Sequence, residues 1–315
     1  MRKHIRGLRL ACVVPSLLVL VSCAKGAPPK AAEPGLWDAH THISWWGEDA
    51  LDSLSKYGIV AVRDCGGDLV QLRRLRDEIA AGTRKGPRIY FSGPQIDGPK
   101  DNDSMRITVR TPEQGVRAVD SLAAFGVDFL KTHNLVPRDT YFAVLREAKV
   151  KGLKVASHLP VGVPAWEAAD SGASSLEHAA ESMLVSPMYA GFAKDLDEAM
   201  AWWRSSAGDS AIAHLARTGV AVTPTLTAYS AFVDEAKNHA DSVGRKEVFE
   251  FQKQLTLRLH RAGVPILAGS DFATRDWIPP GSTLIGEIRM LEVAGLTPAE
   301  ARAAASTNVE RWLRR

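Results

Sequence analysis

Histidine, lysine and aspartate residues lie at the ends of several short apolar runs in this sequence. The first of these segments, residues 38–42, reads Asp-Ala-His-Thr-His. In an extended strand, alternate side chains point to one face, so Asp38, His40 and His42 are expected to lie together. Two imidazoles two positions apart can bind one divalent metal ion. A single His-x-His pair is weak evidence by itself, because most isolated histidines have structural roles.

Four later runs end in residues of the same kinds. In chain order they carry Lys131 and His133, His158, His178, and Asp271. Together with His40 and His42, these side chains offer nitrogen and oxygen ligands that suit Zn²⁺ or a similar divalent ion. Each residue alone has an ordinary structural explanation, so the prediction of a metal site depends on their convergence.

Lys131 is unusual because it lies among Val127, Phe129 and Leu130. A buried ammonium group is costly in free energy. One interpretation is a surface lysine at a strand end. The other is a lysine carbamylated by CO₂, whose new carboxylate bridges two cations. Alternation also places His133 on the same face as Lys131, where it would contact a substrate or adjust the metal site.

Eight short β-rich runs alternate with amphipathic helical patterns from residue 36 onward. The runs are Leu36–Ile43, Ile59–Asp64, Arg88–Ser92, Asp128–His133, Lys154–Leu159, Ser174–Ala179, Val220–Leu226 and Val264–Asp271. Eight β/α units in about 280 residues favour a closed parallel (β/α)8 barrel. The alternative is an open doubly wound sheet, but no glycine-rich phosphate loop follows any run. In a barrel, the carboxyl ends of the strands meet at one face, which brings the candidate ligands together.

The N-terminal residues have the pattern of an export signal. Residues 1–22 contain a basic stretch followed by an apolar run too short for a comfortable membrane span. Leu-Val-Ser-Cys at residues 20–23 is similar to a bacterial lipobox, which predicts cleavage before Cys23 and lipidation of that residue. The alternatives are an ordinary secretory signal with an incidental cysteine, or an uncleaved anchor. Residues 23–34 are rich in Ala and Pro and are expected to form a tether, with the barrel at residues 35–315.

This pattern predicts an exported protein, anchored by lipid in the bacterial membrane and facing the periplasm. Ala24 after the cysteine favours the outer membrane. Four of the 39 Lys and Arg residues lie in residues 1–22, and none of the 36 Asp and Glu residues does. The mature chain therefore has a formal net charge of −1. That near-neutral balance gives no reason to expect nucleic-acid binding. Of the three cysteines, one lies in the signal and Cys23 would carry the lipid, so only Cys65 remains and the mature chain cannot form an internal disulfide. Cys65 is expected to be a buried small residue rather than a nucleophile.

The motifs around these residues resemble those of the binuclear amidohydrolase superfamily. They are PGLWDAHTH at residues 34–42, YGIVAVRD at 57–64, GVDFLK at 126–131, SLEH at 175–178, GSD at 269–271 and AGLTPAEA at 294–301. The resemblance extends over about residues 34–313. It is strongest to the branch of imidazolonepropionase-like proteins and Xaa-Pro dipeptidases. Lys131 favours the two-metal, dipeptidase-like group over imidazolonepropionase itself, which uses one metal.

The resemblance implies a site with two divalent ions, expected to be Zn²⁺. The first ion would be bound by His40, His42 and Asp271, the second by His158 and His178, and carbamylated Lys131 would bridge them. A hydroxide shared by the two ions would attack the substrate, and Asp271 would carry its proton to the leaving amine. Asp38 and Glu177 are expected to support the ligands rather than to bind metal. His133, Tyr229 and Trp46 are candidates for substrate contact.

One departure from the family concerns its small β-sandwich, which is usually assembled from segments on both sides of the barrel. Neither segment is evident here, so a barrel-only form is expected. The function that the resemblance implies is hydrolysis of an amide bond in a small molecule such as a dipeptide or an N-acyl amino acid. Two alternatives remain: lactone or phosphoester hydrolysis at the same site, and a non-catalytic binding lipoprotein with a degenerate barrel.

Overall fold

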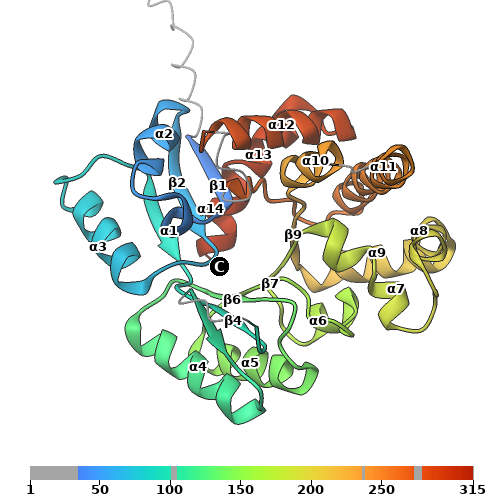
Figure 1. The fold of residues 1–315 in the computed structure, drawn as a ribbon, viewed down its shortest axis with the longest axis horizontal. Coiled ribbons are helices and arrows are strands. Elements are labelled where there is room, and N and C mark those ends of the chain that lie inside the picture. Colours follow the sequence, from blue (N-terminus) through green and yellow to red (C-terminus); the bar gives the residue numbers. More distant parts are fainter. Residues whose placement is uncertain (1–34, 101–104, 236–237, 273–278, 315) are drawn as a thin grey trace, which may run out of the picture. The chain divides into compact units, whose positions relative to one another are not determined.

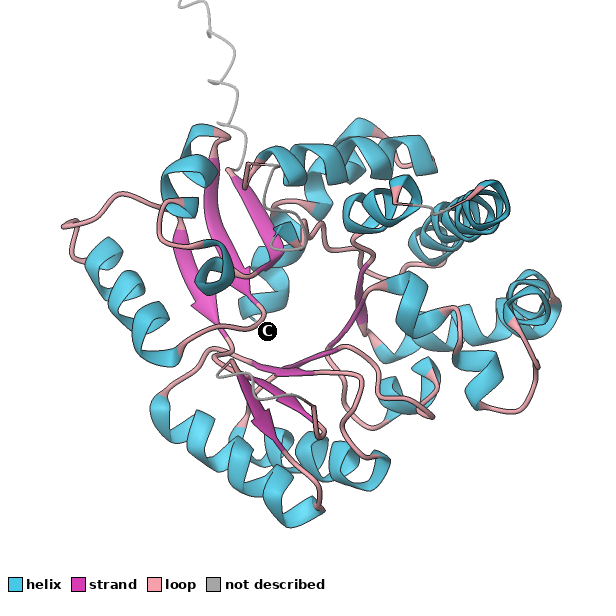
Figure 2. Cartoon of the chain, in the orientation of Figure 1, coloured by secondary structure: helices cyan, strands magenta, loops and turns pink. Residues whose placement is uncertain are grey.

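Short parallel strands surround the centre of the molecule, and helices form a ring outside them (Figures 1 and 2). The structure is a computed structural model and describes residues 35–100, 105–235, 238–272 and 279–314. The predicted signal peptide, the tether and Cys23 lie outside the described residues. One sheet contains β1 (Leu36–Thr41), β2 (Ile59–Asp64) and β3 (Arg88–Phe91). The other, in the order β5-β4-β6-β7-β8-β9, contains β4 (Gln95–Asp97), β5 (Arg106–Thr108), β6 (Leu130–Thr132), β7 (Val155–Ser157), β8 (Ser175–Glu177) and β9 (Ala221–Thr223).

Backbone hydrogen bonds join the two sheets where β3 meets the start of the β6 segment. The Asp128 N–H donates to the Phe91 carbonyl at 3.0 Å. In return, the Asp128 carboxylate accepts the Phe91 N–H at 2.9 Å. The side chain thereby replaces a ladder hydrogen bond where regular pairing stops.

The eighth predicted run closes the barrel on the other side. Its only regular pairing among the described residues is an isolated bridge between Ile266 and Val222. The Leu267 N–H donates to the Val222 carbonyl, and the Ala39 N–H donates to the Ala268 carbonyl, each at 2.9 Å. The run therefore lies between β9 and β1 as an extended segment. The predicted (β/α)8 barrel is confirmed, and the open-sheet alternative is wrong because the sheet closes on itself.

Two strands of the structure were not expected from the sequence. β4 and β5 pair in parallel, with Gln95 opposite Arg106, and β4 also pairs with β6 through Ile96 and Thr132. Both lie in the sheet that contains β6 to β9, so every named strand of the described residues belongs to one of the two barrel sheets.

Most outer helices connect consecutive strands. They are α1 (Ile43–Trp46), α2 (Ala50–Lys56), α3 (Leu69–Ala80), α4 (Pro112–Phe125), α5 (Arg138–Lys151), α6 (Ala165–Asp170), α7 (Ser186–Tyr189), α8 (Leu196–Arg204), α9 (Ser206–Thr218), α10 (Leu226–Asp234), α11 (His239–Arg261), α12 (Ser282–Ala294), α13 (Pro298–Ala304) and α14 (Thr307–Arg314), with a short π-helix at Ala179–Met183. As expected, α5 and α9 end at Gly152 and Gly219, which adopt the left-handed conformation that glycine tolerates best. Within the described ranges, no helix combines the length and apolar character needed to cross a membrane.

The barrel interior changes from apolar to charged along its axis. Trp37 and Phe129 belong to a buried apolar cluster, which Trp312 of α14 completes. The Trp312 indole donates to the carbonyl of Ser174, which directly precedes β8, so α14 covers the N-terminal end of the strands. The candidate ligands lie at the opposite, C-terminal end, where barrel active sites occur.

Candidate metal centre

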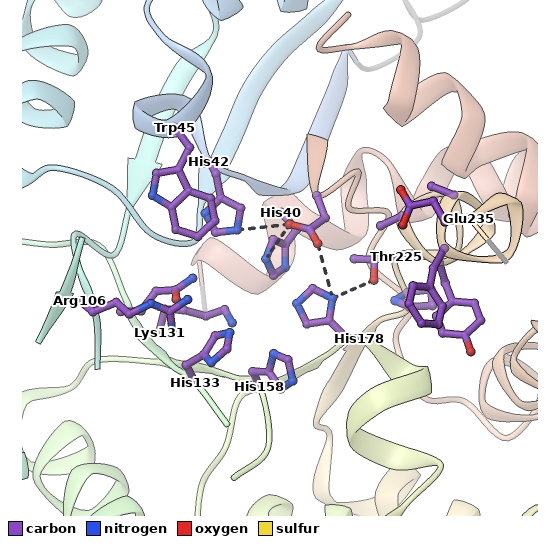
Figure 3. Close-up of a pocket in the computed structure, with 17 residues that line it drawn as sticks. His40, His42, Trp45, Arg106, Lys131, His133, His158, His178, Thr225 and Glu235 are labelled. Atoms are coloured by element: carbon purple, nitrogen blue, oxygen red, sulfur yellow. Dashed lines mark hydrogen bonds and ion pairs between the residues drawn. The ribbon is translucent and has the colours of Figure 1, made fainter. Parts of the chain in front are cut away.

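Three of the predicted ligands converge where β1 meets the eighth extended segment (Figure 3). His40 lies within β1, His42 follows it, and Asp271 ends the extended segment. Their ligand atoms all lie within 4.8 Å of one another. Asp271 Oδ1 is 3.3 Å from His42 Nε2 and 3.8 Å from His40 Nε2. This is a spacing at which one divalent ion can be held by all three side chains.

A hydrogen bond at Nδ1 orients the imidazole ring of both His40 and His42. His40 Nδ1 lies 2.8 Å from Glu177 Oε2, and His42 Nδ1 lies 3.1 Å from the carbonyl oxygen of Gly66. Because a carbonyl only accepts, and a carboxylate accepts when ionised, each Nδ1 carries the proton and each Nε2 presents its lone pair to the site. Among the described residues, the buried Nε2 of His40 has no hydrogen-bond partner. A metal ion would satisfy it, so the donor set fits a bound cation.

The second predicted pair lies beside the first. His158 follows β7 and His178 follows β8, and their ring centroids are 4.9 Å apart. The His178 ring is also 4.7 Å from the His40 ring, and its Nδ1 is 2.9 Å from Thr225 Oγ1. The pair can offer two imidazole nitrogens to one ion, for which a third ligand would come from another group.

Lys131 lies in β6, and its side chain is fully buried yet lines the same cavity. Its Nζ donates to the Thr132 carbonyl at 3.3 Å. Burial lowers the pKa of the Lys131 amine, which increases the fraction of neutral amine. A neutral amine is the form that reacts with CO₂. Lys131 is therefore a buried residue of the cavity wall, which contradicts a surface lysine, and its bridging role stays a prediction.

Burial also keeps the imidazoles in the form that binds metal. It lowers the pKa of His40 to about 4 and holds the pKa values of His158 and His178 well below their usual value. For Asp271, burial alone would raise the pKa, but the interactions with His42, His40 and His178 outweigh it and hold the pKa well below normal. At neutral pH, His40, His158 and His178 are thus neutral and Asp271 is ionised, as metal binding requires.

The ends of three strand segments adopt backbone conformations that are rare for residues other than glycine. His178, Thr225 and Asp271 have φ values of 58°, 50° and 49°. Such left-handed conformations cost free energy and concentrate at functional sites. Here they turn the chain sharply after β8, β9 and the eighth segment, which directs the His178 and Asp271 side chains into the cavity.

Another cluster near His40 is structural. Cys65, His40 and Glu177 also have ligand atoms within 4.8 Å of one another. However, Glu177 is paired with Arg63 through two contacts of 2.8 Å, and burial raises the pKa of the Cys65 thiol far above neutral pH. Asp38 accepts hydrogen bonds from the Ser270 N–H and hydroxyl at 2.9 and 2.5 Å. Glu177 thus orients the His40 ring, and Asp38 holds Ser270, the residue before Asp271.

A cavity of about 330 Å³ opens above the ligands. His133 and Tyr229 line it, and their contact with substrate stays a prediction. The expectation for Trp46 needs correction. Its ring packs edge-to-face on Phe272 and against the core, whereas Trp45 stacks on His42 at 4.2 Å and lines the cavity.

Several other wall residues were not anticipated from the sequence. They are Gln95, Arg106, Pro224, Thr225, Ala228, Ala231, Phe232 and Glu235. Arg106 belongs to β5, a strand without a periodic sequence signal. Phe232 and Glu235 lie on and just after α10, one and two helical turns beyond Tyr229, and that spacing was the available clue.

No protein-family model matches this sequence, and no curated protein is significantly similar to it. Solved structures do match. A bottromycin amidohydrolase is 23% identical with a TM-score of 0.73, over 89% of this chain and 67% of its own. A Xaa-Pro dipeptidase with methionine bound in its active site is 20% identical with a TM-score of 0.66, over 89% and 75%. The A. niger ochratoxinase is 18% identical with a TM-score of 0.67, over 89% and 71%. The chain therefore shares its barrel fold with these solved structures.

Proposed function

We propose that this protein is a metal-dependent hydrolase of the amidohydrolase superfamily that cleaves an amide bond in a small substrate, such as a dipeptide or an N-acyl amino acid. The convergence of His40, His42 and Asp271 within 4.8 Å, at the C-terminal end of a barrel and beneath a cavity, carries this proposal. The unsatisfied Nε2 of His40 supports it, because such a buried atom is costly without a ligand.

The proposed ligand set uses all six candidate residues. One ion, Zn²⁺ or a similar cation, would be held by His40, His42 and Asp271, the other by His158 and His178, with carbamylated Lys131 between them. Bound divalent ions at such a site lower the pKa of water and polarise a carbonyl.

The chain's own residues then have distinct tasks. Asp271 is ionised, so its carboxylate can accept a proton from the attacking water and deliver it to the leaving amine. Glu177 and the Gly66 carbonyl hold the His40 and His42 rings in one tautomer. Trp45 and Tyr229 border the space that a substrate would occupy and would limit access of bulk water.

The structural neighbours favour amino-acid-derived substrates. The Xaa-Pro dipeptidase holds methionine in its active site, and a related prolidase structure contains N-methylphosphonate-L-proline. The cavity here combines a polar floor with aromatic walls, which suits a small amide with an apolar substituent. Hydrolysis of lactones or phosphoesters, and binding without catalysis, are the competing outcomes of the experiment below.

The test begins with the purified protein loaded with Zn²⁺. Metal content is measured, and turnover is assayed on N-acyl amino acids, dipeptides, lactones and phosphoesters. We expect about two ions per chain, from the ligand count, and turnover of amides that His178→Ala abolishes. His214→Ala is the matched control, because His214 is part-exposed and pairs with Asp170 outside the site. Preferential turnover of lactones or phosphoesters would contradict the amide proposal. Less than about one ion per chain, without turnover of any substrate, would favour a non-catalytic binding protein.

Lys131 gives a separate test of the binuclear form. Carbamylation joins the amine nitrogen to the carbon of CO₂ and releases one proton. The intact protein should therefore carry the extra mass of one CO₂. Lys131→Ala should lose metal and activity, and a short carboxylic acid should restore part of both. Lys131→Arg should resist rescue, because the guanidinium fills the space and keeps its charge. Normal turnover by Lys131→Arg would remove the bridging role.

A further inference from the structure

One helix and the turn before it supply much of the wall of the cavity above the candidate metal ligands. Of the 17 residues that line the cavity, seven belong to residues 224–235, which include α10. They are Pro224, Thr225, Ala228, Tyr229, Ala231, Phe232 and Glu235. Most of these side chains are apolar, and the position of α10 therefore determines the shape of the apolar space beside the ligands.

The start of α10 is capped by a residue of another helix. Thr225, the residue before α10, makes no side-chain cap hydrogen bond and has a left-handed backbone with a φ of 50°. Instead, Glu287 of α12 accepts the Leu226 N–H at 3.0 Å through Oε1 and the Thr227 N–H at 2.7 Å through Oε2. These are two of the N–H groups that have no acceptor within a helix. An ionised carboxylate also interacts favourably with the dipole at this end of a helix.

Glu287 is fully buried and is not one of the described residues that line the cavity. Its helix lies alongside α10 (Figure 1). The two helices approach closely at Gly286, where a Cβ atom would lie 3.3 Å from both Cγ2 and Oγ1 of Thr227. Burial raises the pKa of Glu287 to about 7, although the two backbone hydrogen bonds oppose this rise. At about pH 8.5 the carboxylate is mainly ionised, and its charge-assisted hydrogen bonds are then strong.

The other end of α10 has a separate attachment. Arg245 of α11 donates to the Phe232 carbonyl at 2.6 Å, and its guanidinium carbon lies 3.8 Å from the centroid of the Phe232 ring. Tyr229 stacks on Phe249 of α11, with ring centroids 6.1 Å apart. Loss of the Glu287 carboxylate should therefore release the first turn of α10 while the rest of the helix stays packed.

We propose that Glu287 is a positioning residue of the candidate active site. By holding the first turn of α10, it fixes the wall that contacts the apolar substituent of a substrate, and so determines how strongly a large substituent is preferred over a small one. This role in specificity rests on the proposed amide hydrolysis, whereas the attachment of α10 does not. A wall that contacts a substituent away from the scissile bond acts mainly on binding, so its displacement should raise KM more than it lowers kcat.

The first test measures the attachment of α10 without an assay of activity. Hydrogen exchange is followed by mass spectrometry at about pH 8.5, where Glu287 is mainly ionised, in the parent and in Glu287→Gln. Gln keeps the shape but loses the charge and directs an NH₂ donor towards a backbone N–H. Exchange in α10 should become on the order of 10-fold faster, as the loss of a hydrogen bond to a charged group predicts, and exchange in α9 should stay unchanged. Asp195→Asn is the matched control, because exposed Asp195 accepts the Glu198 N–H at 2.9 Å and caps α8.

The second test compares two amides that differ in the size of one substituent. Values of kcat and KM are measured for N-acetylglycine and N-acetyl-L-phenylalanine with the Zn²⁺-loaded protein, and binding is measured by calorimetry. Glu287→Gln should raise KM for the phenylalanine compound on the order of 10-fold. KM for the glycine compound, and kcat for both, should change less than about threefold, with bound metal retained. Glu287→Asp keeps the charge on a shorter side chain, so it should give an intermediate KM and remain informative if Glu287→Gln fails to fold. Asp195→Asn should leave both compounds unaffected.

The outcomes separate the attachment, the specificity and the proposed function. Unchanged exchange in α10 of Glu287→Gln would overturn the attachment. Faster exchange with equal changes for both compounds would overturn the role in specificity while amide hydrolysis stands. A loss of bound metal would also overturn it, because the effect would then pass through Thr225 Oγ1 to His178, whose Nδ1 lies 2.9 Å away. Binding of N-acetyl-L-phenylalanine that depends on Glu287, without turnover of any amide, would support the positioning role and contradict the proposed function.

Discussion

Replacing Arg63 with Met should destabilise the metal-free protein by about 3–5 kcal/mol, the cost of breaking a buried ion pair from one side. Arg63 in β2 is fully buried, and its Nη2 contacts both oxygens of Glu177 at 2.8 Å. Its Nη1 donates to Ser175 Oγ at 2.9 Å, and its guanidinium lies 4.5 Å from the Trp312 ring centroid. Met fills much of the volume of the Arg63 aliphatic chain. The loss in free energy of unfolding therefore reflects mainly the Glu177 carboxylate, which is left buried without its cation.

A double-mutant cycle isolates this pair. Glu177→Gln alone leaves Arg63 without its anion, whereas Arg63→Met with Glu177→Gln leaves neither charge buried. The double variant should therefore be more stable than the sum of the single losses predicts, by about 2 kcal/mol or more. The exposed Arg74, which pairs with Glu48 and Glu78, provides the control Arg74→Met, and its effect should be far smaller.

The pH dependence has a definite sign. Burial alone would raise the pKa of Glu177, but Arg63 and His40 outweigh it and hold the pKa well below its usual value. The ion pair of Arg63 and Glu177 therefore contributes fully to folding stability above the pKa of glutamate in the unfolded chain, about 4.3. This contribution is lost as the pH falls towards the pKa of Glu177 in the folded protein. In Arg63→Met, burial instead favours a protonated Glu177. The stability difference between parent and variant should consequently begin to shrink as the pH falls towards about 4.3, and it should shrink further below that value.

Equilibrium urea denaturation, followed by tryptophan fluorescence and circular dichroism in the presence of a chelator, measures these free energies. Coincident transitions by both probes establish that a single free energy applies. A loss below about 1 kcal/mol for Arg63→Met, or additive losses in the cycle, would show that the pair is not the dominant buried interaction.

Three further outcomes test other parts of the site and chain. His158→Ala should reduce bound metal to about one ion per chain, because one of two imidazole ligands of the second ion is lost; elemental analysis that still finds two ions would exclude it as a ligand. Gly269→Ala would place a Cβ 2.6 Å from both His40 Cβ and Thr223 Cγ2, so thermal stability should fall by about 1–3 kcal/mol together with metal affinity; an unchanged Tm would contradict this packing. We also propose that Cys23 is lipidated after export, so Cys23→Ala should abolish labelling by a fatty-acid analogue in cells, and a label that persists would refute it.

The barrel and the position of the ligand cluster could be predicted because they depend on regular patterns. Eight apolar runs separated by helical periodicity define a closed parallel barrel, and closure forces the strand ends together. His158, His178 and Asp271 each follow the last apolar residues of a run, so the fold itself brings them to one cavity. No knowledge of individual contacts was needed for that step.

The remaining features depend on contacts that have no periodic signal. β4 and β5 are three residues each and lie in a region rich in glycine and proline, so Asp97 and Arg106 were not expected near the site. Which of Trp45 and Trp46 lines the cavity depends on the direction of the four-residue helix α1. The alternation of side chains along the preceding strand does not predict that direction. The role of Arg63 depends on its partner 114 residues away in sequence.

The interior of the barrel links stability to the geometry of the candidate metal centre. Phe129 and Trp312 form a buried aromatic layer against the Arg63 guanidinium, whose Cζ lies 5.5 and 4.5 Å from the two ring centroids. Low local polarity strengthens the pairing of Arg63 with Glu177. Glu177 in turn holds His40 Nδ1, which leaves Nε2 directed at the site. The aromatic layer at one end of the barrel therefore acts on a candidate metal ligand, His40, at the other end through the buried pair of Arg63 and Glu177. Water admitted at Trp312 would weaken both this pair and the orientation of His40.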